Sequence, residues 1–165
     1  MTTINKLPES TYLVRFPDCD PFNHLNNSKY IDYFINARED HLRDFHQFEI
    51  YQFTQQTGTS WVVGQNQIAY FAPATLMEKV VIQTTVLEWN NSDILVEMRM
   101  WDTAKTQLKA LLWTRFVHID MKTLKRIHHT AELTERFKHL ANPLEQPQTF
   151  DQRAMAVRRK KLDEW

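Results

Sequence analysis

The residues between Asp18 and Tyr30 carry most of the chemistry that this sequence offers. Two carboxylates, one imidazole and two amides fall within thirteen residues, in the order Asp18-Cys-Asp20-Pro-Phe-Asn-His24-Leu-Asn26-Asn27-Ser-Lys-Tyr30. An amphipathic pattern from Tyr30 to Phe45 follows directly and predicts a helix. Acidic side chains just before a helix lie beside backbone N–H groups that can bind developing negative charge. A base next to an anion-binding site is what acyl transfer requires.

One of these acids, Asp20, is the candidate for the reacting group. It could act on water as a general base, or attack a carbonyl carbon itself to give an anhydride. A backbone N–H in the first turn of the helix, near Asn27, would then stabilise the oxyanion with help from the helix dipole. A structural role is equally compatible, because an Asp before a helix often only caps it and Asp-Pro often only starts a turn. Local chemistry alone leaves capping and catalysis both open.

Metal chemistry fits the same segment poorly. A calcium loop would begin like Asp18-x-Asp20, but Phe22 and Lys29 then stand where oxygen ligands are needed. The two acids and His24 also lack the closed spacing of a transition-metal set, so no metal is expected. No cofactor is expected either.

Nucleophilic catalysis by Ser or Cys is also disfavoured. Ser28 lacks the glycines of a nucleophile elbow. Cys19 stands between two carboxylates, which raise rather than lower the pKa of a thiol, so we interpret it as a small buried side chain. As the single cysteine it excludes an intrachain disulfide and a cysteine-based zinc site.

The composition is that of one globular domain without a charged partner. The 165 residues include 20 Lys+Arg and 20 Asp+Glu, so the formal net charge is zero. No overall positive charge attracts nucleic acid or an anionic membrane. The apolar runs are too short for membrane insertion, and the polar start of the chain does not resemble a signal peptide. A cytoplasmic location is the expectation.

A strand and a helix must position the Asp18–Tyr30 segment. The apolar run from Tyr12 to Phe16, stopped by Pro17, predicts a strand that enters a turn. Asn23 is expected to adopt the left-handed conformation in that turn. The helix should begin at one of three capping residues, Asn26, Asn27 or Ser28. Its apolar stripe is formed by Tyr30, Phe34, Ala37, His41 and Phe45, with Ile31, Ile35, Arg38 and Leu42 beside it.

The second half of the chain is dominated by strands. Alternation in Ile94, Val96, Met98 and Met100 and a hairpin turn at 90–93 predict antiparallel pairing, and Thr130 to Leu140 is expected to be helical. Long antiparallel strands after one central helix predict an α+β fold. The predicted strands span Trp61 to Phe71, Lys79 to Trp89, Ile94 to Trp101 and Gln107 to Asp120.

The end of the chain differs in character. We divide the protein into a domain of residues 1–141 and a C-terminal extension of residues 142–165. Within the extension, Ala154, Val157 and Leu162 could dock a short helix. The basic run at 158–161 is interpreted as a solvated charged tail.

The run from Val14 to Tyr30 resembles the signature of the 4-hydroxybenzoyl-CoA thioesterase family. The resemblance extends over about residues 12 to 128, through Ile68-Ala-Tyr70-Phe-Ala-Pro73 and Thr114-Arg-Phe-Val-His-Ile-Asp120. It implies the hot-dog fold, a curved antiparallel sheet wrapped around one long helix. It also implies a homodimer with sheets paired edge to edge, in a family whose dimers often pair again into homotetramers.

The resemblance also separates the roles of the site residues. It implies that Asp20 is the catalytic carboxylate, with the backbone N–H of Asn27 as oxyanion donor. His24, Asn26 and Tyr30 would bind substrate, shape the pocket or hold the loop, and Asp18 would support the turn. Trp61 and Trp89 could serve the dimer interface or an acyl pocket, although aromatic residues on strands often belong to the core.

The function implied is an acyl-CoA thioesterase, which hydrolyses an acyl-CoA or another acyl thioester to a free carboxylic acid and a thiol. The alternative is a non-catalytic hot-dog module that binds an acyl-CoA or a protein. A hot-dog hydratase ranks lower, because no His-and-Asp or His-and-Glu pair stands in the helix setting that such enzymes need.

Overall fold

The long helix α1 is the axis of the fold. In the computed structural model, which describes residues 4–159, α1 spans Asn27–His46. Asn26 is its N-cap and accepts a hydrogen bond from the backbone N–H of Ser28 at 3.0 Å. Gln47 ends the helix in the left-handed conformation, with φ 50°. The helix predicted from Tyr30 to Phe45 is therefore confirmed, with three further residues at its start and one at its end.

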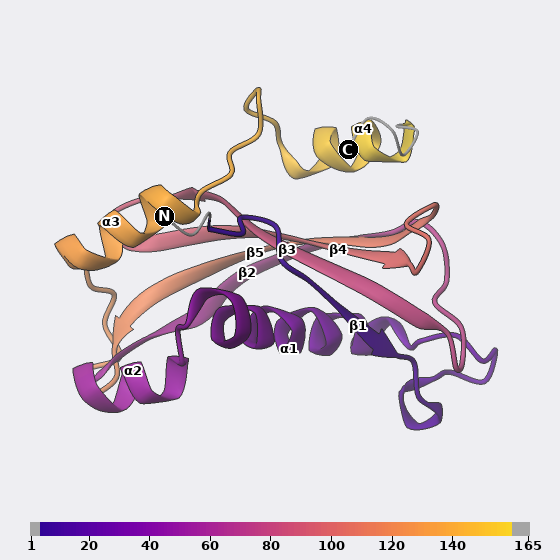
Figure 1. Ribbon diagram of the computed structural model, residues 1–165, viewed down its shortest axis with the longest axis horizontal. Coiled ribbons are helices and arrows are strands. Elements are labelled where there is room, and N and C mark those ends of the chain that lie inside the picture. The colour runs from indigo at the N-terminus through magenta and orange to yellow at the C-terminus, as the bar shows by residue number, and fades with distance from the viewer. Residues whose placement is uncertain (1–3, 160–165) are drawn as a thin grey trace.

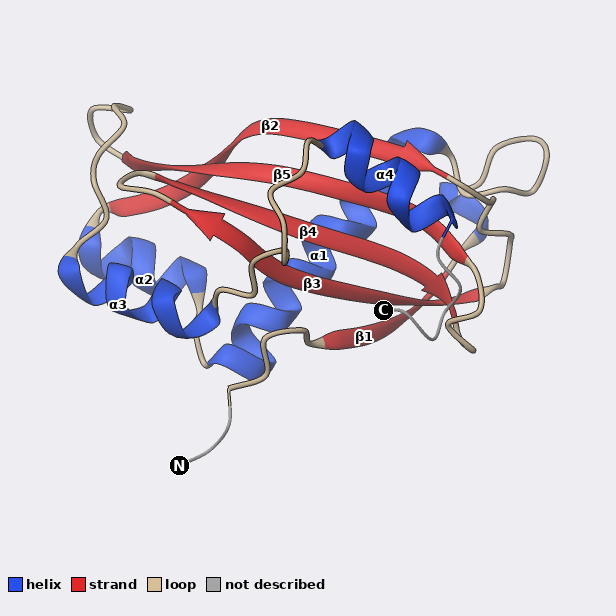
Figure 2. Cartoon of the chain, turned by 90° about the horizontal axis from the view of Figure 1, so that it is seen from above, coloured by secondary structure: helices blue, strands red, loops and turns tan. Residues whose placement is uncertain are grey.

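Within residues 4–159, five antiparallel strands form one sheet that curves around α1 (Figure 1). The strand order is β1-β3-β4-β5-β2, so β1 and β2 are the two edges (Figure 2). The predicted antiparallel α+β arrangement is confirmed. The strands are β1 (Glu9–Leu13), β2 (Thr59–Tyr70), β3 (Lys79–Trp89), β4 (Asp93–Asp102) and β5 (Leu108–Asp120).

Shorter helices flank the sheet and α1. The helix α2 (Ile50–Thr57) follows α1 and, with α3 (Ala131–Leu140), lies near the C-terminal end of α1. The helix α4 (Phe150–Arg159) lies on the face of the sheet opposite to α1 (Figure 1). A short 3₁₀ turn, η1 (Phe16–Asp18), precedes the chemistry-bearing loop.

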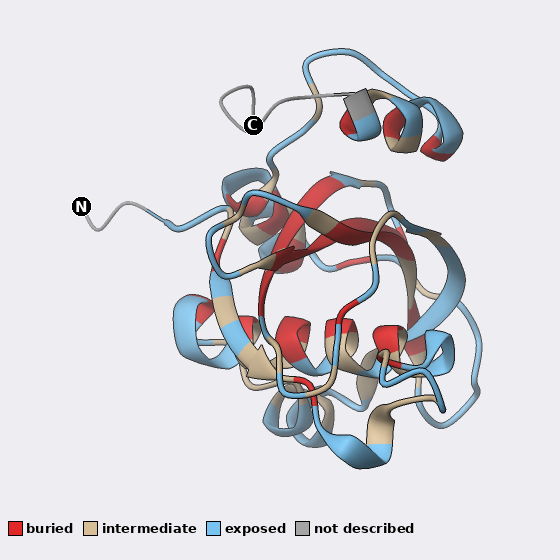
Figure 3. Cartoon of the chain, turned by 90° about the vertical axis from the view of Figure 1, so that its right-hand side faces the viewer, coloured by how far each residue is buried: buried red, intermediate tan, exposed pale blue. Residues whose placement is uncertain are grey.

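The alternation of side chains along the strands produces two cores, one on each face of the sheet. Ile94, Val96, Met98 and Met100 of β4 all face α1 and pack in the main core, as the sequence predicts. On the opposite face, β4 and β5 pack against Phe150 and Val157 of α4. Figure 3 shows the buried residues gathered along the sheet and on the side of α1 that faces it. The short docking helix predicted near the C-terminus is thus present, although Leu162 lies outside the described residues.

Two predictions at the start of the chain are wrong in detail. The strand predicted from Tyr12 to Phe16 ends at Leu13, where its pairing with Lys79 of β3 ends. Pro17 has no N–H to donate to a strand and lies in the first turn of η1, which begins at Phe16, and Phe16 is 76% exposed. Cys19, predicted to be buried, is only half-buried in the loop.

Two features around the end of α1 also differ from the expectation. Phe45, placed in the apolar stripe, is 45% exposed, although its neighbour His46 in the same turn of α1 is buried. The helix α2 was not predicted, since it is short and contains no buried residue. The carboxylate of Glu49 caps it by accepting from the backbone N–H groups of Tyr51 (3.2 Å) and Gln52 (2.7 Å), and Gly58 ends it at φ 70°.

Candidate active site

The chemistry-bearing residues form a small hairpin that leads into α1. Cys19 and Leu25 pair as an isolated antiparallel bridge, and the backbone N–H of Asp20 donates to the carbonyl of His24 at 2.8 Å. At the tip, Asn23 has φ 60°, the left-handed conformation that the sequence predicts. One arm of the hairpin carries Asp20, and the other arm runs directly into the start of α1.

The carboxylate of Asp20 is oriented by its own loop. Its Oδ1 atom accepts hydrogen bonds from the backbone N–H groups of Phe22 (2.9 Å) and His24 (3.1 Å). Within residues 4–159, Oδ2 has no hydrogen-bond partner. One oxygen thus fixes the side chain while the other remains available, which is the arrangement that a general base or a nucleophile requires.

The start of α1 offers an anion-binding group next to this hairpin. Asn26 satisfies the N–H of Ser28, but the N–H of Asn27, the first residue of the helix, has no acceptor in the described part of the chain. The first N–H groups of a helix lack intrahelical partners, and the helix dipole adds partial positive charge there. The carbonyl of Asn27 accepts from the hydroxyl of Tyr70 at 3.1 Å, which fixes this first turn against β2.

Tyr30 lies behind this first turn, inside the core. It is 2% exposed, its ring packs edge-on against Tyr70 at 5.1 Å, and its hydroxyl accepts from the backbone N–H of Ala74 at 3.0 Å. Burial raises the pKa of Tyr30. Tyr30 therefore connects α1 to the segment after β2. Its contact with substrate stays a prediction.

Asp18 and His24 hold the two sides of the hairpin. The carboxylate of Asp18 accepts from the hydroxyl of Tyr33 on α1 at 2.8 Å. Burial and this hydrogen bond raise the pKa of Tyr33 to about 12. The backbone of His24 bridges to Thr75, whereas its half-buried ring makes no hydrogen bond within residues 4–159. Asp18 thus has the supporting position that the resemblance implies.

Two other titratable side chains, His41 of α1 and Cys19 of the hairpin, also have shifted pKa values. His41 is fully buried, with its ring nitrogens bonded to the hydroxyls of Thr84 (2.8 Å) and Ser10 (2.7 Å), and burial lowers its pKa to about 4. Burial and the charges of both flanking acids raise the pKa of Cys19. Among the described residues, no group of three or more His, Cys, Asp or Glu could hold a metal ion.

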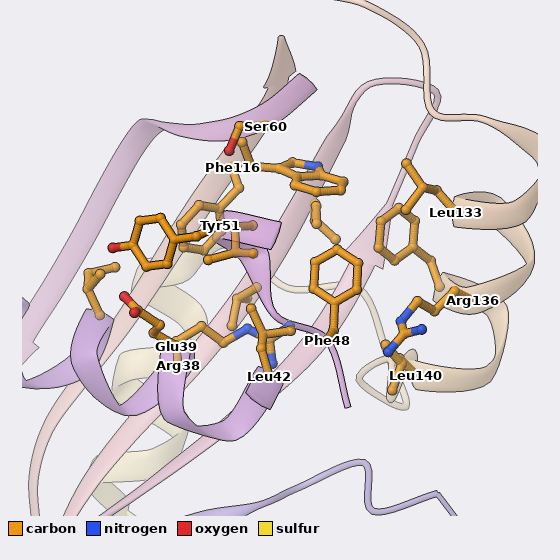
Figure 4. A pocket seen from close by; sticks show the side chains of 16 residues that line it. Arg38, Glu39, Leu42, Phe48, Tyr51, Ser60, Phe116, Leu133, Arg136 and Leu140 are labelled. Carbon is orange, nitrogen blue, oxygen red and sulfur yellow. The ribbon is translucent and has the colours of Figure 1, made fainter. Parts of the chain in front are cut away.

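A cavity of about 270 Å³ lies at the other end of α1, between α1, α2, α3 and the sheet (Figure 4). Trp61 of β2 forms part of its wall and stacks on His118 at 4.7 Å. Arg38 of α1 also lines it, although the sequence only placed this residue beside the apolar stripe. In the sequence, the feature that could have indicated this cavity is a charged residue, Arg38, beside the apolar stripe of the predicted helix.

These observations define the class of the protein. A curved antiparallel sheet around one long helix, preceded by a hairpin with a carboxylate, is the hot-dog arrangement. Residues 14–155 match the Thioesterase-like superfamily, and the chain belongs to that superfamily.

Individual relatives agree with this assignment. The chain is 27% identical to the long-chain acyl-CoA thioesterase FadM of Escherichia coli (strain K12) over 127 residues, 77% of this chain and 94% of FadM. It is 26% identical to the acyl-CoA thioesterase YbgC of Haemophilus influenzae over 132 residues, 77% of this chain and 91% of YbgC. The crystal structure of the probable thioesterase YbaW from Escherichia coli superposes with a TM-score of 0.70 at 25% identity, covering 81% of this chain and 98% of that one. The predicted hot-dog fold and the predicted enzyme class, a thioester hydrolase, are thereby confirmed.

Proposed function

We propose that this protein is an acyl-CoA thioesterase in which Asp20 and the N-terminus of α1 perform the hydrolysis. Two observations carry the proposal: within residues 4–159, Asp20 Oδ2 has no hydrogen-bond partner, and the N–H of Asn27, at the start of the helix into which the Asp20 hairpin runs, has no acceptor. The names of the similar proteins FadM and YbgC support acyl-CoA as the thioester.

The reaction follows from these two groups. Asp20 removes a proton from water as the water oxygen attacks the thioester carbonyl, and the N–H of Asn27 binds the resulting oxyanion. Collapse of the tetrahedral intermediate breaks the C–S bond, and the thiolate leaves and takes up a proton. In the nucleophilic route, Asp20 attacks first and water then hydrolyses the anhydride. Both routes yield a free acid and CoA.

The carboxylate is tested by Asp20→Asn and Asp20→Ala. Both variants are expected to lose thioester hydrolysis while they keep the fold and the oligomeric state. Thiol release over a panel of aliphatic and aromatic acyl-CoAs is the assay. Near-normal turnover by a folded variant would remove Asp20 from the mechanism. Binding of acyl-CoA by the wild type without release of thiol across the panel would instead support the non-catalytic module.

The donor is tested by a matched pair of variants at Asn27. Asn27→Pro removes the backbone N–H at the first position of the helix, where proline is well tolerated, and Asn26 already has the φ −61° and ψ 136° that suit a residue before proline. Asn27→Ala changes the side chain but keeps the donor. Loss of one oxyanion donor costs about 10²–10³ in kcat. Equal kcat values for the two folded variants would exclude this N–H as the oxyanion donor.

The predicted homodimer belongs to the same proposal. β2 is an edge strand of 12 residues, and Val62 and Val63 on it are 42% and 47% exposed. Long, exposed edge strands are normally covered or paired, and a two-fold axis at β2 would pair it with its own copy. Light scattering in solution tests the dimer and the further pairing into a tetramer.

Three further expectations from the sequence also stay proposals. They are substrate contacts by His24 and Asn26, a domain boundary between residues 141 and 142, and a cytoplasmic location. Within the described chain, no helix is long and apolar enough to cross a membrane.

A further inference from the structure

The cavity at the C-terminal end of α1 has apolar walls and a charged group on one side. Its wall includes Leu42, Phe48, Trp61 and Phe116, from α1, the segment after it, and the sheet (Figure 4). A hollow lined by aliphatic and aromatic side chains with few polar groups is the usual form of a small-molecule site.

The charged residues among those that line the cavity are Arg38, Glu39 and Arg136, and Arg38 is the most deeply buried of them. It is 6% exposed, and its Nη1 atom is buried without a hydrogen-bond acceptor in the described part of the chain. Within residues 4–159, Arg38 forms neither a hydrogen bond nor an ion pair. Burial lowers its pKa to about 10, so the guanidinium remains positively charged at neutral pH. Buried charges in proteins are normally paired, and an exception requires an explanation.

The groups around Arg38 do not neutralise it. Glu39 also lines the cavity, but Figure 4 shows its carboxylate on the side of Tyr51, whereas Arg38 extends toward Leu42. Arg136 enters from α3 on the other side, and its own guanidinium is engaged by the carbonyl of His46 and by the ring of Phe48, 4.8 Å away. Arg136 is only half-buried, whereas Arg38 is a buried cation that has no paired anion within residues 4–159, and the cavity presents it to whatever enters.

We propose that this cavity binds an apolar chain that carries a carboxylate, and that the carboxylate pairs with Arg38. A carboxylate accepts charge-assisted hydrogen bonds from a guanidinium in the planar geometry that suits both groups. Such a carboxylate has two sources. It is either the far end of an acyl thioester, in which case the inference rests on the proposed function, or the carboxylate of a free acid.

In the dimer proposed above, the far end of an acyl group bound at one active site could reach Arg38. Within one chain, Arg38 comes eleven residues after Asn27, about 16 Å along the helix. Antiparallel pairing of β2 with its copy, however, places the Tyr70 end of one strand near the Trp61 end of the other. Tyr70 contacts the start of α1 and Trp61 lines the cavity. An acyl group held at the partner's Asn27 would then extend toward Arg38.

The cavity is tested first by binding, independently of hydrolysis. Calorimetry compares octanoate with octan-1-ol on the full-length protein, on Arg38→Met, and on Arg43→Met as control. Arg43 is on the same helix, but it is exposed and forms surface ion pairs with Asp40 and Asp44. We expect wild type and Arg43→Met to bind octanoate at least tenfold more tightly than octan-1-ol, and Arg38→Met to lose this preference. Equal affinities in the wild type, no binding of octanoate, or an unchanged preference in Arg38→Met would overturn the inference.

Hydrolysis then separates the two sources of the carboxylate. Octanoyl-, decanoyl- and dodecanoyl-CoA are compared with the matching ω-carboxyl acyl-CoAs. If the acyl end is the source, the ratio of kcat/KM for ω-carboxyl over plain substrates falls at least tenfold in Arg38→Met and not in Arg43→Met. If the free acid is the source, this ratio is unchanged, and octanoate inhibits the wild type but not Arg38→Met.

Two further results would separate a failure of the proposed function from a failure of the carboxylate site at Arg38. A carboxylate preference at Arg38 with no hydrolysis of any thioester would support the cavity and refute the thioesterase proposal. Dissociation of the oligomer in Arg38→Met, but not in Arg43→Met, would mean that Arg38 pairs across a subunit interface, and would overturn the inference alone.

Discussion

Glu97 and Arg153 form a buried ion pair that should attach α4 to the sheet. Glu97 on β4 is 0% exposed, and its carboxylate accepts from Nε and Nη2 of Arg153 on α4, both at 2.9 Å. It also accepts from Arg99 at 2.7 Å and from the indole N–H of Trp113 at 2.8 Å. Burial alone would raise the pKa of Glu97, but the hydrogen bond from Arg153 and the charges of both arginines lower it to about 2. The pair thus favours the ionised carboxylate strongly.

The perturbation is Arg153→Met, which keeps an apolar side chain on α4 and removes the two hydrogen bonds. The fall in the pKa of Glu97 from 4.5 to about 2 corresponds to about 3 kcal/mol of stability at pH 7. Breaking a buried pair by removing one partner costs about 3–5 kcal/mol. Because Arg99 and Trp113 remain bonded to Glu97, we expect a loss of about 2–3 kcal/mol in the free energy of unfolding.

The stability that Arg153 contributes through Glu97 should depend on pH. The pKa of Glu97 is lowered on folding, so its contribution to stability is present above pH 4.5 and is lost as the pH falls toward 2. Without Arg153 the folded pKa rises toward its ordinary value, and the variant has less to lose in acid. The stability difference between wild type and Arg153→Met should therefore be largest near pH 7 and shrink below about pH 4.

Urea unfolding measured at pH 7 and pH 3.5 is the assay, followed by tryptophan fluorescence. Trp113 contributes to this signal together with the four other tryptophans, and its ring lies 5.6 Å from that of Phe150 on α4. Arg158→Met is the control on the same helix, because Arg158 is exposed and lies over Phe71 at 5.3 Å, an interaction worth about 0.5–1 kcal/mol. A loss below about 0.5 kcal/mol at pH 7 for Arg153→Met, with no change in acid, would refute the reasoning.

Three further predictions concern stability. Arg38→Met should raise the free energy of unfolding by about 1–3 kcal/mol, since it replaces a buried cation that has no partner within residues 4–159 by an apolar side chain, and destabilisation in urea would contradict this. Gly64→Ala should cost about 1–3 kcal/mol, because its Cβ would lie 2.7 Å from Cγ2 of Val117; Val117→Ala in the same chain should recover part of that loss. Burial lowers the pKa of His41 from 6.5 to about 4, so only the unfolded chain takes up this proton between these values and stability falls by up to about 3 kcal/mol as the pH drops. His41→Gln should show a shallower fall of stability between pH 7 and pH 4.5, and an unchanged slope would show that other groups cause it.

Much of the fold could be predicted because its signals are local in the chain. The period of the apolar residues from Tyr30 onward is that of a helix, and the alternation from Ile94 to Met100 is that of a strand with one buried face. The left-handed turn at Asn23 and the position of Asp20 before the helix were also readable, since turns and caps depend on neighbouring residues. α2 was missed because its capping Glu49 and its polar sequence produce no apolar period.

What only the tertiary structure decided is which charges are buried and what compensates them. Glu97 is paired with a residue 56 positions away, and nothing local to β4 predicts that a helix covers its outer face. Arg38 follows the helical period like its neighbours, yet its burial, with no partner among the described residues, depends on α2, α3 and the sheet together. The free energy of a charge depends on every group around it in space, whereas the sequence orders only the groups along the chain. The sequence thus determined the helix and the carboxylate-bearing turn before it, in which we propose the reaction centre, and the three-dimensional packing decided the cavity that we propose selects the substrate.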